Sequence, residues 1–394
     1  MAKKKKTTKK KSTKKKKAKK KKVDESFGVL GTKKLYSPVR ERISCGMPVI
    51  DAIMGGPVRT IDGNTVVLQS DGTPATAWGV PIGRILEVVG GYGTGKSTFV
   101  ETLATKVQQA GGDIYMGITE ATLDPDRMCR MGCDPERIRY KEFEYIEDGF
   151  EWVELILTDR AKRKQKPPFL ITWDTVGASH SKDERPGSGG REVREGLRKI
   201  TNLVAQANAI MLFVNQTSAT FDKWETEPAT PFGMGIRFHA SVRLEFKGQK
   251  KYTEAEAVRP GRSTYTESKA IYGILPVVSC RKNKTFPPFR RCRMPVSFQE
   301  GLDEDFGTYL YLSDRKSNLV VTGPTKEDAK LLGLPDAAAV VKTYGNVITF
   351  KMDPPQACYW NTYQQYLQEH TDLREWMVDR CRIMAYNGYD PLRS

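Results

Sequence analysis

Residues 84–100 read Arg-Ile-Leu-Glu-Val-Val-Gly-Gly-Tyr-Gly-Thr-Gly-Lys-Ser-Thr-Phe-Val. An apolar run, Ile85–Val89, leads directly into the pattern G-x-x-x-x-G-K-S, which is complete between Gly90 and Ser97. The apolar residues that follow recur at helical spacing and share one face. They are Phe99, Val100, Leu103, Ala104 and Val107. Strand, glycine loop and helix in this order predict a phosphate-binding loop.

This loop is expected to hold the phosphates of ATP together with Mg²⁺. Glycines let backbone N–H groups converge on phosphate oxygens, and the helix N-terminus favours negative charge. Lys96 is expected to neutralise the β- and γ-phosphates, and Ser97 to hold Mg²⁺. The residues assigned here to ATP binding are Gly90, Gly91, Tyr92, Gly93, Thr94, Gly95, Lys96, Ser97 and Thr98.

Three further apolar strands are expected, and a polar residue follows each of them. The strands span 114–118, 169–173 and 211–214. Asp174 is expected to bind the Mg²⁺ shell, Glu120 to polarise the attacking water, and Gln216 to sense the γ-phosphate. Each has a simpler explanation: an Asp that merely ends a buried strand, a solvated loop glutamate and a structural amide. The upstream phosphate loop favours the catalytic interpretation.

The alternation of strands and helices predicts an α/β fold with a mainly parallel sheet flanked by helices. One helix between the expected strands places Val193, Leu197, Ile200 and Val204 on one side. Further strands are expected at Ser241–Phe246 and Gly273–Cys280, and a β-hairpin at 58–68 precedes the core. After about residue 320 the pattern weakens, and helices are expected at Lys326–Leu332 and Asp372–Met384.

Positive charge is concentrated at the N-terminus. The formal net charge is +17, but fifteen lysines lie within residues 1–22, and without them the charge falls to +2. Such a segment cannot bury apolar surface, so it is expected to be disordered. It would add sequence-independent attraction to nucleic-acid phosphates. A nuclear address and a simple solubility tail remain as alternatives.

Other features of the composition narrow the class of protein. The chain has no apolar run of about 18 residues, so a membrane span is not expected. No apolar segment follows the basic N-terminus, which argues against a signal peptide. The seven cysteines are scattered and odd in number, as in a cytosolic protein with reduced thiols. Cys129 and Cys133 lack a second ligand pair, so zinc is not expected.

Several segments together resemble the RecA-type DNA recombinase family. They keep the family's order over roughly residues 43–320, and they are Ile43–Gly46, Pro81–Arg84, Thr119–Pro125, Phe213–Gln216, Phe238–Leu244 and Arg281–Lys284. The resemblance implies a RecA-like P-loop NTPase core and a small C-terminal α+β domain. The expected division is a tail at 1–22, a lead-in at 23–80, the core at 81–320 and the C-terminal domain at 321–394.

The resemblance also implies a nucleoprotein filament with ATP between subunits. Lys282 and Lys284 would reach the ATP of a neighbouring subunit, so that neither half of the site is complete alone. Asp124 would contact the adenine. Arg127, however, occupies the place where the bacterial family usually has an adenine-stacking tyrosine, and it leaves base recognition open. This departure, the lysine tail and the hairpin suggest a divergent member, for which a phage origin is one option.

Two loops, 177–190 and 217–235, are expected to bind single- and double-stranded DNA. Both follow core strands and are rich in Gly, Pro, Ser and Thr. Phe221 and Trp224 are expected to stack on bases. The residues expected to contact phosphates are Arg185, Arg191, Arg198, Lys223 and Arg237. Both loops also carry acidic residues, so ordinary surface loops remain an alternative.

The function expected is ATP-dependent homologous pairing and strand exchange by a filament on single-stranded DNA. A hexameric helicase or other DNA motor on the same core is the first alternative. A filament that uses ATP only as a switch is the second. The lysine pair argues against the helicase, because such enzymes typically use an arginine in trans. The expected location is the cytoplasm of a prokaryotic or phage-infected cell, with the nucleus left open.

Overall fold

The structure is a computed structural model, and it describes most of the chain after residue 40. The described ranges are 41–56, 59–61, 64–66, 78–119, 124–163, 167–217, 230–232, 234–253, 271–313, 320–322, 330–331 and 347–386. The lysine-rich tail lies outside them, as does most of the helix expected at Lys326–Leu332.

An eight-stranded sheet forms the centre, in the order β14-β13-β10-β5-β9-β8-β6-β7. The run from β10 to β7 is parallel throughout, while β13 and β14 are antiparallel to their neighbours. The bounds are β5 Arg84–Gly90, β6 Asp113–Ile118, β7 Ile138–Glu142, β8 Phe169–Asp174, β9 Ala209–Gln216, β10 Val242–Lys247, β13 Val277–Asn283 and β14 Arg291–Arg293. The mainly parallel sheet that the alternating pattern predicts is confirmed.

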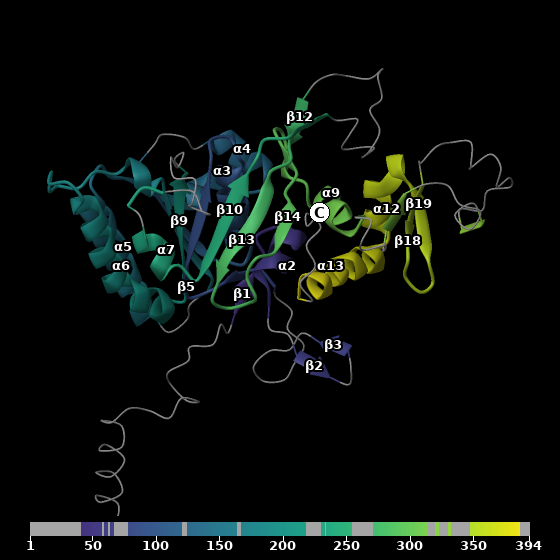
Figure 1. The fold of residues 1–394 in the computed structure, drawn as a ribbon, viewed down its shortest axis with the longest axis horizontal. Helices are drawn as coiled ribbons and strands as arrows, with labels where there is room; N and C mark the ends of the chain where they lie inside the picture. Colours follow the sequence, from purple (N-terminus) through teal and green to yellow (C-terminus); the bar gives the residue numbers. More distant parts are fainter. Residues whose placement is uncertain are drawn as a thin grey trace, which may run out of the picture. The chain divides into compact units, whose positions relative to one another are not determined.

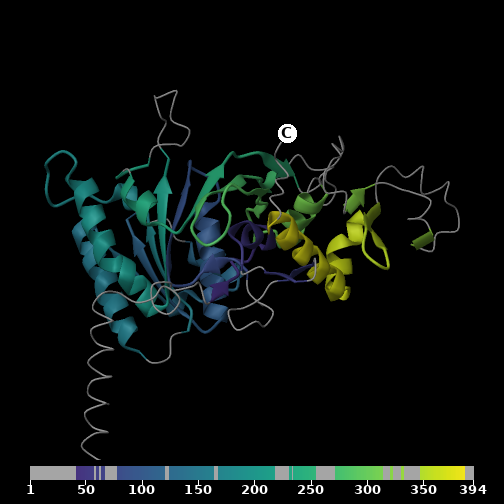
Figure 2. The same ribbon diagram turned by 60° about the horizontal axis from the view of Figure 1, so that its bottom comes forward.

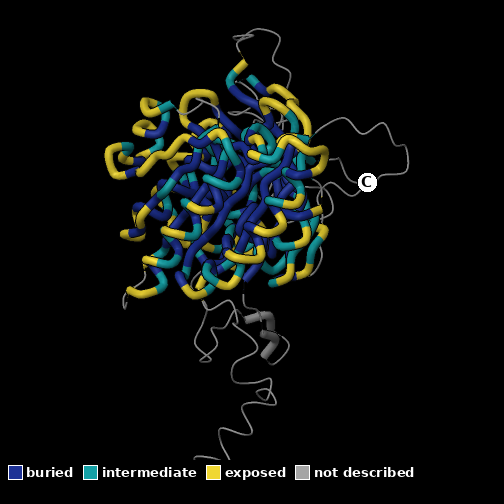
Figure 3. Tube along the Cα trace, turned by 90° about the vertical axis from the view of Figure 1, so that its left-hand side faces the viewer, coloured by how far each residue is buried: buried dark blue, intermediate teal, exposed yellow. Residues whose placement is uncertain are grey.

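Helices cover both faces of this sheet. One face carries α3 (Lys96–Gln109) and α4 (Pro125–Arg130), and the other carries α5 (Ile146–Lys162), α6 (Ser188–Ala207) and α7 (Met234–His239). Figures 1 and 2 both place α5 and α6 side by side on the same flank of the sheet. The apolar faces predicted for α3 and α6 are buried. Figure 3 shows buried residues running through the middle of the molecule and exposed ones around it.

The strand expected at Gly273–Cys280 is in fact two strands in two sheets. Leu275 and Pro276 separate β12 (Ile271–Ile274) from β13. Proline has no backbone N–H to donate to a ladder, which explains the break. The second sheet has the order β11-β12-β15-β16, and its other strands are β11 Lys251–Thr253, β15 Val296–Ser297 and β16 Gly301–Leu302. Because of this division, residues of β12 and β15 line the cavity beside the glycine loop, opposite the loop itself.

The lead-in segment contributes a buried helix and the expected hairpin. Helix α2 (Pro48–Met54) buries every residue from Val49 to Met54. A short pair of strands, β1 (Arg42–Ile43) and β4 (Val80–Pro81), brackets it. Between them β2 (Arg59–Ile61) pairs antiparallel with β3 (Asn64–Val66), as predicted.

The C-terminal region is a small three-stranded sheet with helices. Its elements are β17 Val320–Thr322, β18 Val347–Phe350, β19 Gln356–Tyr359, η3 Trp360–Thr362, α12 Tyr363–Glu369 and α13 Thr371–Tyr386. Helix α13, close to the expected Asp372–Met384, packs on α2 and on α9 (Glu304–Leu312).

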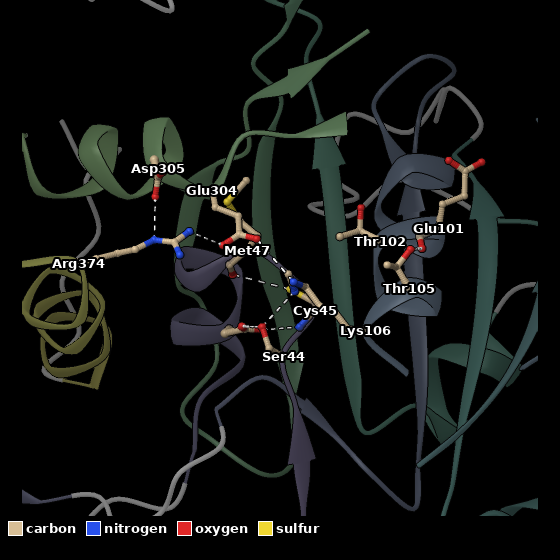
Figure 4. Close-up of polar contacts among 12 residues, drawn as sticks. Ser44, Cys45, Met47, Glu101, Thr102, Thr105, Lys106, Glu304, Asp305 and Arg374 are labelled. Atoms are coloured by element: carbon tan, nitrogen blue, oxygen red, sulfur yellow. Dashed lines mark hydrogen bonds and ion pairs between the residues drawn. The ribbon is translucent and has the colours of Figure 1, made fainter. Parts of the chain in front are cut away.

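Charged side chains connect α13 to the phosphate-loop helix through α9. Arg374 donates to Glu304 and Asp305, at 3.1 Å in each case, and Glu304 also pairs with Lys106 of α3 at 3.7 Å (Figure 4).

Among the described helices, none combines the length and apolarity that crossing a membrane requires.

Candidate nucleotide-binding site

The glycine loop between β5 and α3 is wound tightly around its own lysine. Gly93 and Gly95 have φ of +64° and +83°, a region that favours glycine. A Cβ at Gly90 would lie 2.5 Å from the Phe246 carbonyl oxygen, so a side chain does not fit there. Lys96 Nζ donates to the carbonyl oxygens of Gly90 and Gly91 at 3.0 and 2.7 Å. The ammonium therefore lies inside the loop, where phosphate oxygens would be bound.

An open cavity of about 360 Å³ lies beside this loop. The loop and the start of α3 form one wall with Tyr92, Gly93, Thr94, Gly95, Lys96, Ser97 and Thr98. The other lining residues are Arg127, Asp174, Gln216, Ile274, Val296, Ser297 and Phe298. Gly90 and Gln216 are register partners at the carboxyl ends of β5 and β9, and Asp174 ends the next strand. Ligands typically bind at this end of a parallel sheet.

The residues expected to hold Mg²⁺ come together here. Ser97 and Asp174 line the cavity and also a smaller hollow beneath it. A hydroxyl and a carboxylate are the oxygen ligands that Mg²⁺ prefers, with water and phosphate oxygens completing the shell. Within the described ranges, no group of three or more His, Cys, Asp or Glu side chains could hold a metal alone. The Ser97 hydroxyl and the Asp174 carboxylate fit a Mg²⁺ ion whose remaining ligands are water and phosphate oxygens.

Glu120, the expected water-polarising residue, lies outside the described residues, but the residue before it is firmly placed. Thr119 N donates to Asp174 O at 3.0 Å. Its hydroxyl donates to Thr175 O at 2.8 Å and accepts from Thr175 N at 2.9 Å. The end of β6 is thereby joined to the end of β8. The family resemblance included Thr119 only as the first residue of the segment Thr119–Pro125 and gave it no role of its own.

Asp124 and Arg127 lie at the start of α4, and only Arg127 lines the cavity. The Asp124 carboxylate caps the helix by accepting from Arg127 N at 2.9 Å. Arg127 donates from Nε and Nη2 to the two carboxylate oxygens of Glu101, at 2.8 and 2.5 Å. Burial raises the pKa of Glu101, and Arg127 opposes that rise. The sequence analysis did not single out Glu101. A carboxylate within the apolar segment 99–104 does, however, indicate a buried charge that needs a partner.

A buried polar network lies in the sheet directly before Gln216. Glu87 in β5 and Arg243 in β10 are 0% and 1% exposed, and Arg243 Nε donates to Glu87 Oε2 at 2.9 Å. Asn215 Nδ2 donates to Glu87 Oε1 at 3.1 Å. This network fixes the strand end that carries Gln216. Its sequence signal is a glutamate inside the apolar run 85–89.

Lys282 and Lys284 lie at the opposite end of the sheet from the phosphate loop. Lys282 is the register partner of Arg243, which lies beside Glu87. Lys282 Nζ donates to the carbonyl oxygens of Arg237 and Phe238 at 2.6 and 2.9 Å, and Lys284 Nζ donates to Phe238 O at 3.2 Å. Burial lowers the pKa of Lys282 to about 8, and the charge of Lys284 acts in the same direction.

The residues expected to bind DNA are only partly described. Arg185 pairs side-on with Asp183, which it holds at a pKa of about 2. Arg191 and Arg198 lie on the exposed side of α6, and Arg237 lies in α7. Phe221, Lys223 and Trp224 lie outside the described residues.

The ends of the two expected DNA loops pack against each other. A Cβ at Gly177 would lie 2.6 Å from the Pro231 ring, and one at Gly189 would lie 2.6 Å from the Phe232 ring. Helix α6 begins at Ser188, so the last residues of the first expected loop are its first turn. The described end of the second loop, Pro231 and Phe232, therefore lies against both ends of the first.

Comparison with known proteins identifies similar sequences over this core. The RecA N-terminal domain family matches residues 65–303. The chain is 30% identical to Protein RecA of Thermus thermophilus over 237 residues, which cover 57% of this chain and 64% of that protein. It is 26% identical to Protein RecA of Wolinella succinogenes over 263 residues, covering 63% of this chain and 70% of that protein. The match to the Thermus protein thus spans somewhat less than two thirds of that relative.

Proposed function

The chain belongs to the RecA family, and on that premise we propose that it is a DNA-dependent ATPase that forms a filament on single-stranded DNA and exchanges homologous strands. One observation carries the proposal. Lys96, Ser97, Asp174 and Gln216 surround one cavity, while the Lys282–Lys284 pair lies at the other end of the same sheet. This arrangement suits a nucleotide site completed by a second copy of the chain.

Within one subunit, each residue of the cavity has a distinct task. Lys96 is held inside the loop and neutralises phosphate charge, while Ser97 and Asp174 provide oxygen ligands on the side of the metal. Bound ATP and Mg²⁺ supply the phosphoanhydride bond and the charge neutralisation of its cleavage. Glu120, which follows the fixed Thr119, would orient and deprotonate water. Gln216 would detect the γ-phosphate from the end of β9.

The register of the sheet favours a contribution of the lysine pair in trans. Glu87, beside the strand position of Lys282, lies three residues before Gly90, or roughly 10 Å along the strand. Both ammonium groups are directed to the end of α7, away from the loop of their own subunit. They are therefore better placed to meet the nucleotide of a neighbour. Hydrolysis would then depend on assembly.

DNA binding is assigned to the paired loops and to the tail. The loop 177–190 begins beside Asn215, and the described end of the loop 217–235 packs on it, so nucleotide occupancy sensed at Gln216 would be coupled to the loops. Arg191 and Arg198 would contact phosphates next to them, and Phe221 and Trp224 would stack on bases. The lysine-rich tail would add non-specific attraction.

A strand-exchange assay tests the proposal. The protein is combined with ATP, Mg²⁺, circular single-stranded DNA and a homologous linear duplex, and joint molecules are separated on a gel. Glu120→Gln serves as the variant expected to bind ATP and hydrolyse it very slowly. Electron microscopy on single-stranded DNA separates the alternatives: helical filaments support the recombinase, whereas closed rings that unwind a duplex would establish a helicase.

A further inference from the structure

Asp174 lies where the backbone ladder of β8 has run out. The last β8–β6 pair is Asp174 with Ile118, and the last β8–β9 pair comes one residue earlier, Trp173 with Phe213. Residues at the end of a ladder open locally at low cost. Mg²⁺, however, demands near-ideal octahedral geometry from its ligands. The inference below rests on the proposed ATP site, since it concerns how that site holds its metal ligand in place.

Thr119 bonds both polar groups of the peptide unit that follows Asp174. The Thr119 N–H donates to Asp174 O at 3.0 Å, and the Thr175 N–H donates to Thr119 Oγ1 at 2.9 Å. The Thr119 hydroxyl donates its own hydrogen to Thr175 O at 2.8 Å. A hydroxyl has one hydrogen and two lone pairs, so it can make both of these bonds at once. A single residue thus holds the end of β8 to the end of β6 with three hydrogen bonds.

Thr175 holds the same peptide from the other side. It is 3% exposed, and its hydroxyl donates to Val214 O at 3.1 Å. Val214 follows Phe213, the last ladder partner of β8 on β9, so the hydroxyl replaces a ladder bond that β8 no longer makes. The next residue, Asn215, donates to the buried Glu87 at 3.1 Å. The Thr175 bond is therefore anchored on a strand end that a buried network already fixes.

Asp174 itself lines the nucleotide cavity, whereas the two threonines do not. Asp174 and Ser97 line the large cavity, and Thr172 joins them around the small hollow beneath it. Neither Thr119 nor Thr175 is among the residues that line either space. Both threonine hydroxyls give their hydrogen to backbone carbonyls. An effect of these hydroxyls on the metal must therefore pass through Asp174.

We propose that Thr119 and Thr175 are positioning residues for Mg²⁺, which clamp the peptide after Asp174 between β6 and β9. The metal ligands Ser97 and Asp174 belong to different elements, α3 and β8, and they keep their separation only if the end of β8 does not move. The glycine loop and Lys96 belong to β5 and α3, and they bind phosphates without help from this clamp. Loss of the clamp weakens the binding of the metal and leaves the binding of the phosphates unchanged.

Mn²⁺ binding to the full chain with saturating ADP tests this assignment without any need for hydrolysis. Electron paramagnetic resonance measures free Mn²⁺ during the titration, and calorimetry in EDTA measures ADP affinity without metal. Thr119→Val should lose about tenfold in Mn²⁺ affinity, as expected when a hydrogen-bonded support of a metal ligand is removed, and should keep the metal-free ADP affinity. Thr175→Val should lose Mn²⁺ affinity in the same way. Thr119→Ser keeps the hydroxyl and should bind Mn²⁺ as the unmodified protein does.

Thr308→Val is the matched control. Thr308 lies in α9, is 4% exposed, and donates from its hydroxyl to Glu304 O at 2.8 Å, so the variant loses a buried bond of the same kind away from the cavity. Its melting temperature should fall while its Mn²⁺ affinity stays the same. If Thr119→Val does not fold, Thr175→Val and Thr119→Ser still decide the question.

Three results would overturn the proposal. The first is unchanged Mn²⁺ affinity in folded Thr119→Val or Thr175→Val. The second is an equal loss of Mn²⁺ affinity and metal-free ADP affinity. The third is Mn²⁺ binding by Thr119→Ser that is as weak as that of the valine variant. If the unmodified protein binds ADP but no Mn²⁺, the metal assignment of Ser97 and Asp174 fails first, and if it binds no ADP, the proposed function fails.

Discussion

Lys282 provides a test of the inter-subunit contact because its charge should be lost within an accessible pH range. Burial lowers its pKa to about 8 from the ordinary value of 10.5. In the free subunit roughly 90% of Lys282 is charged at pH 7 and roughly 10% at pH 9. If the charged form is needed to meet the neighbour's phosphates, ATP-dependent assembly should weaken by up to about tenfold per pH unit above 8.

The titration of Lys282 affects the free energy of unfolding in the opposite direction to assembly. A pH series can therefore distinguish a loss of assembly from a loss of folding stability. The folded-state pKa lies below the unfolded value, so between about pH 8 and 10.5 the unfolded chain binds more protons than the folded one. The contribution of Lys282 to the free energy of unfolding therefore rises with pH in that range. Loss of assembly above pH 8 would not be explained by this group's effect on stability.

The assay is fluorescence anisotropy of a labelled single-stranded oligonucleotide, with and without ATP, from pH 7 to 9.5 at constant ionic strength. Lys282→Arg stays charged throughout and should remove most of the pH dependence. Lys162→Arg, at the exposed end of α5, is the matched control and should follow the unmodified protein. Parallel pH profiles for Lys282→Arg and the unmodified protein would refute the assignment of Lys282 to the interface.

Three other perturbations have defined outcomes. Lys96→Ala should abolish Mg²⁺–ADP binding in calorimetry, because the charge inside the glycine loop is lost. Arg243→Met should lower the free energy of unfolding in urea by about 3–5 kcal/mol, since it leaves Glu87 charged and buried, and adding Glu87→Gln should recover part of this loss. Deleting residues 2–22 should reduce the slope of log affinity for single-stranded DNA against log salt by about 0.7 for each lysine engaged. An unchanged slope would assign the tail a role other than DNA attraction.

The features that the sequence predicted correctly are those set by local patterns. The strand, glycine loop and helix at 84–109 are contiguous in sequence, and the apolar periodicity of α3 and α6 is visible without knowledge of what covers them. The hairpin before the core has its turn signal in adjacent residues. The order of these elements was sufficient to predict the fold class, because alternating strands and helices form a mainly parallel sheet in nearly all known folds of this kind.

What the sequence did not reveal depends on long-range placement. The break at Pro276 assigns neighbouring residues to two sheets, and periodicity does not distinguish them. The pairing of Glu101 with Arg127 joins two helices, and the Phe298 wall comes from a separate sheet. Lys282 and Lys284 were singled out by resemblance, yet their contact with the end of α7 follows only from the register of β10 and β13.

The packing of α13 on α2 has a consequence for synthesis of the chain. Helix α2 ends at Met54, and α13 begins at Thr371, so about 320 residues separate the two. A ribosome adds roughly 5–20 residues per second, and α2 must therefore wait about 16–60 s for its last partner. During that time Val49, Ile50 and Ile53 lack part of their final cover. Nascent chains should be targets for chaperones that bind short apolar helices, and ribosomes stalled before residue 371 should carry a core still open at α2.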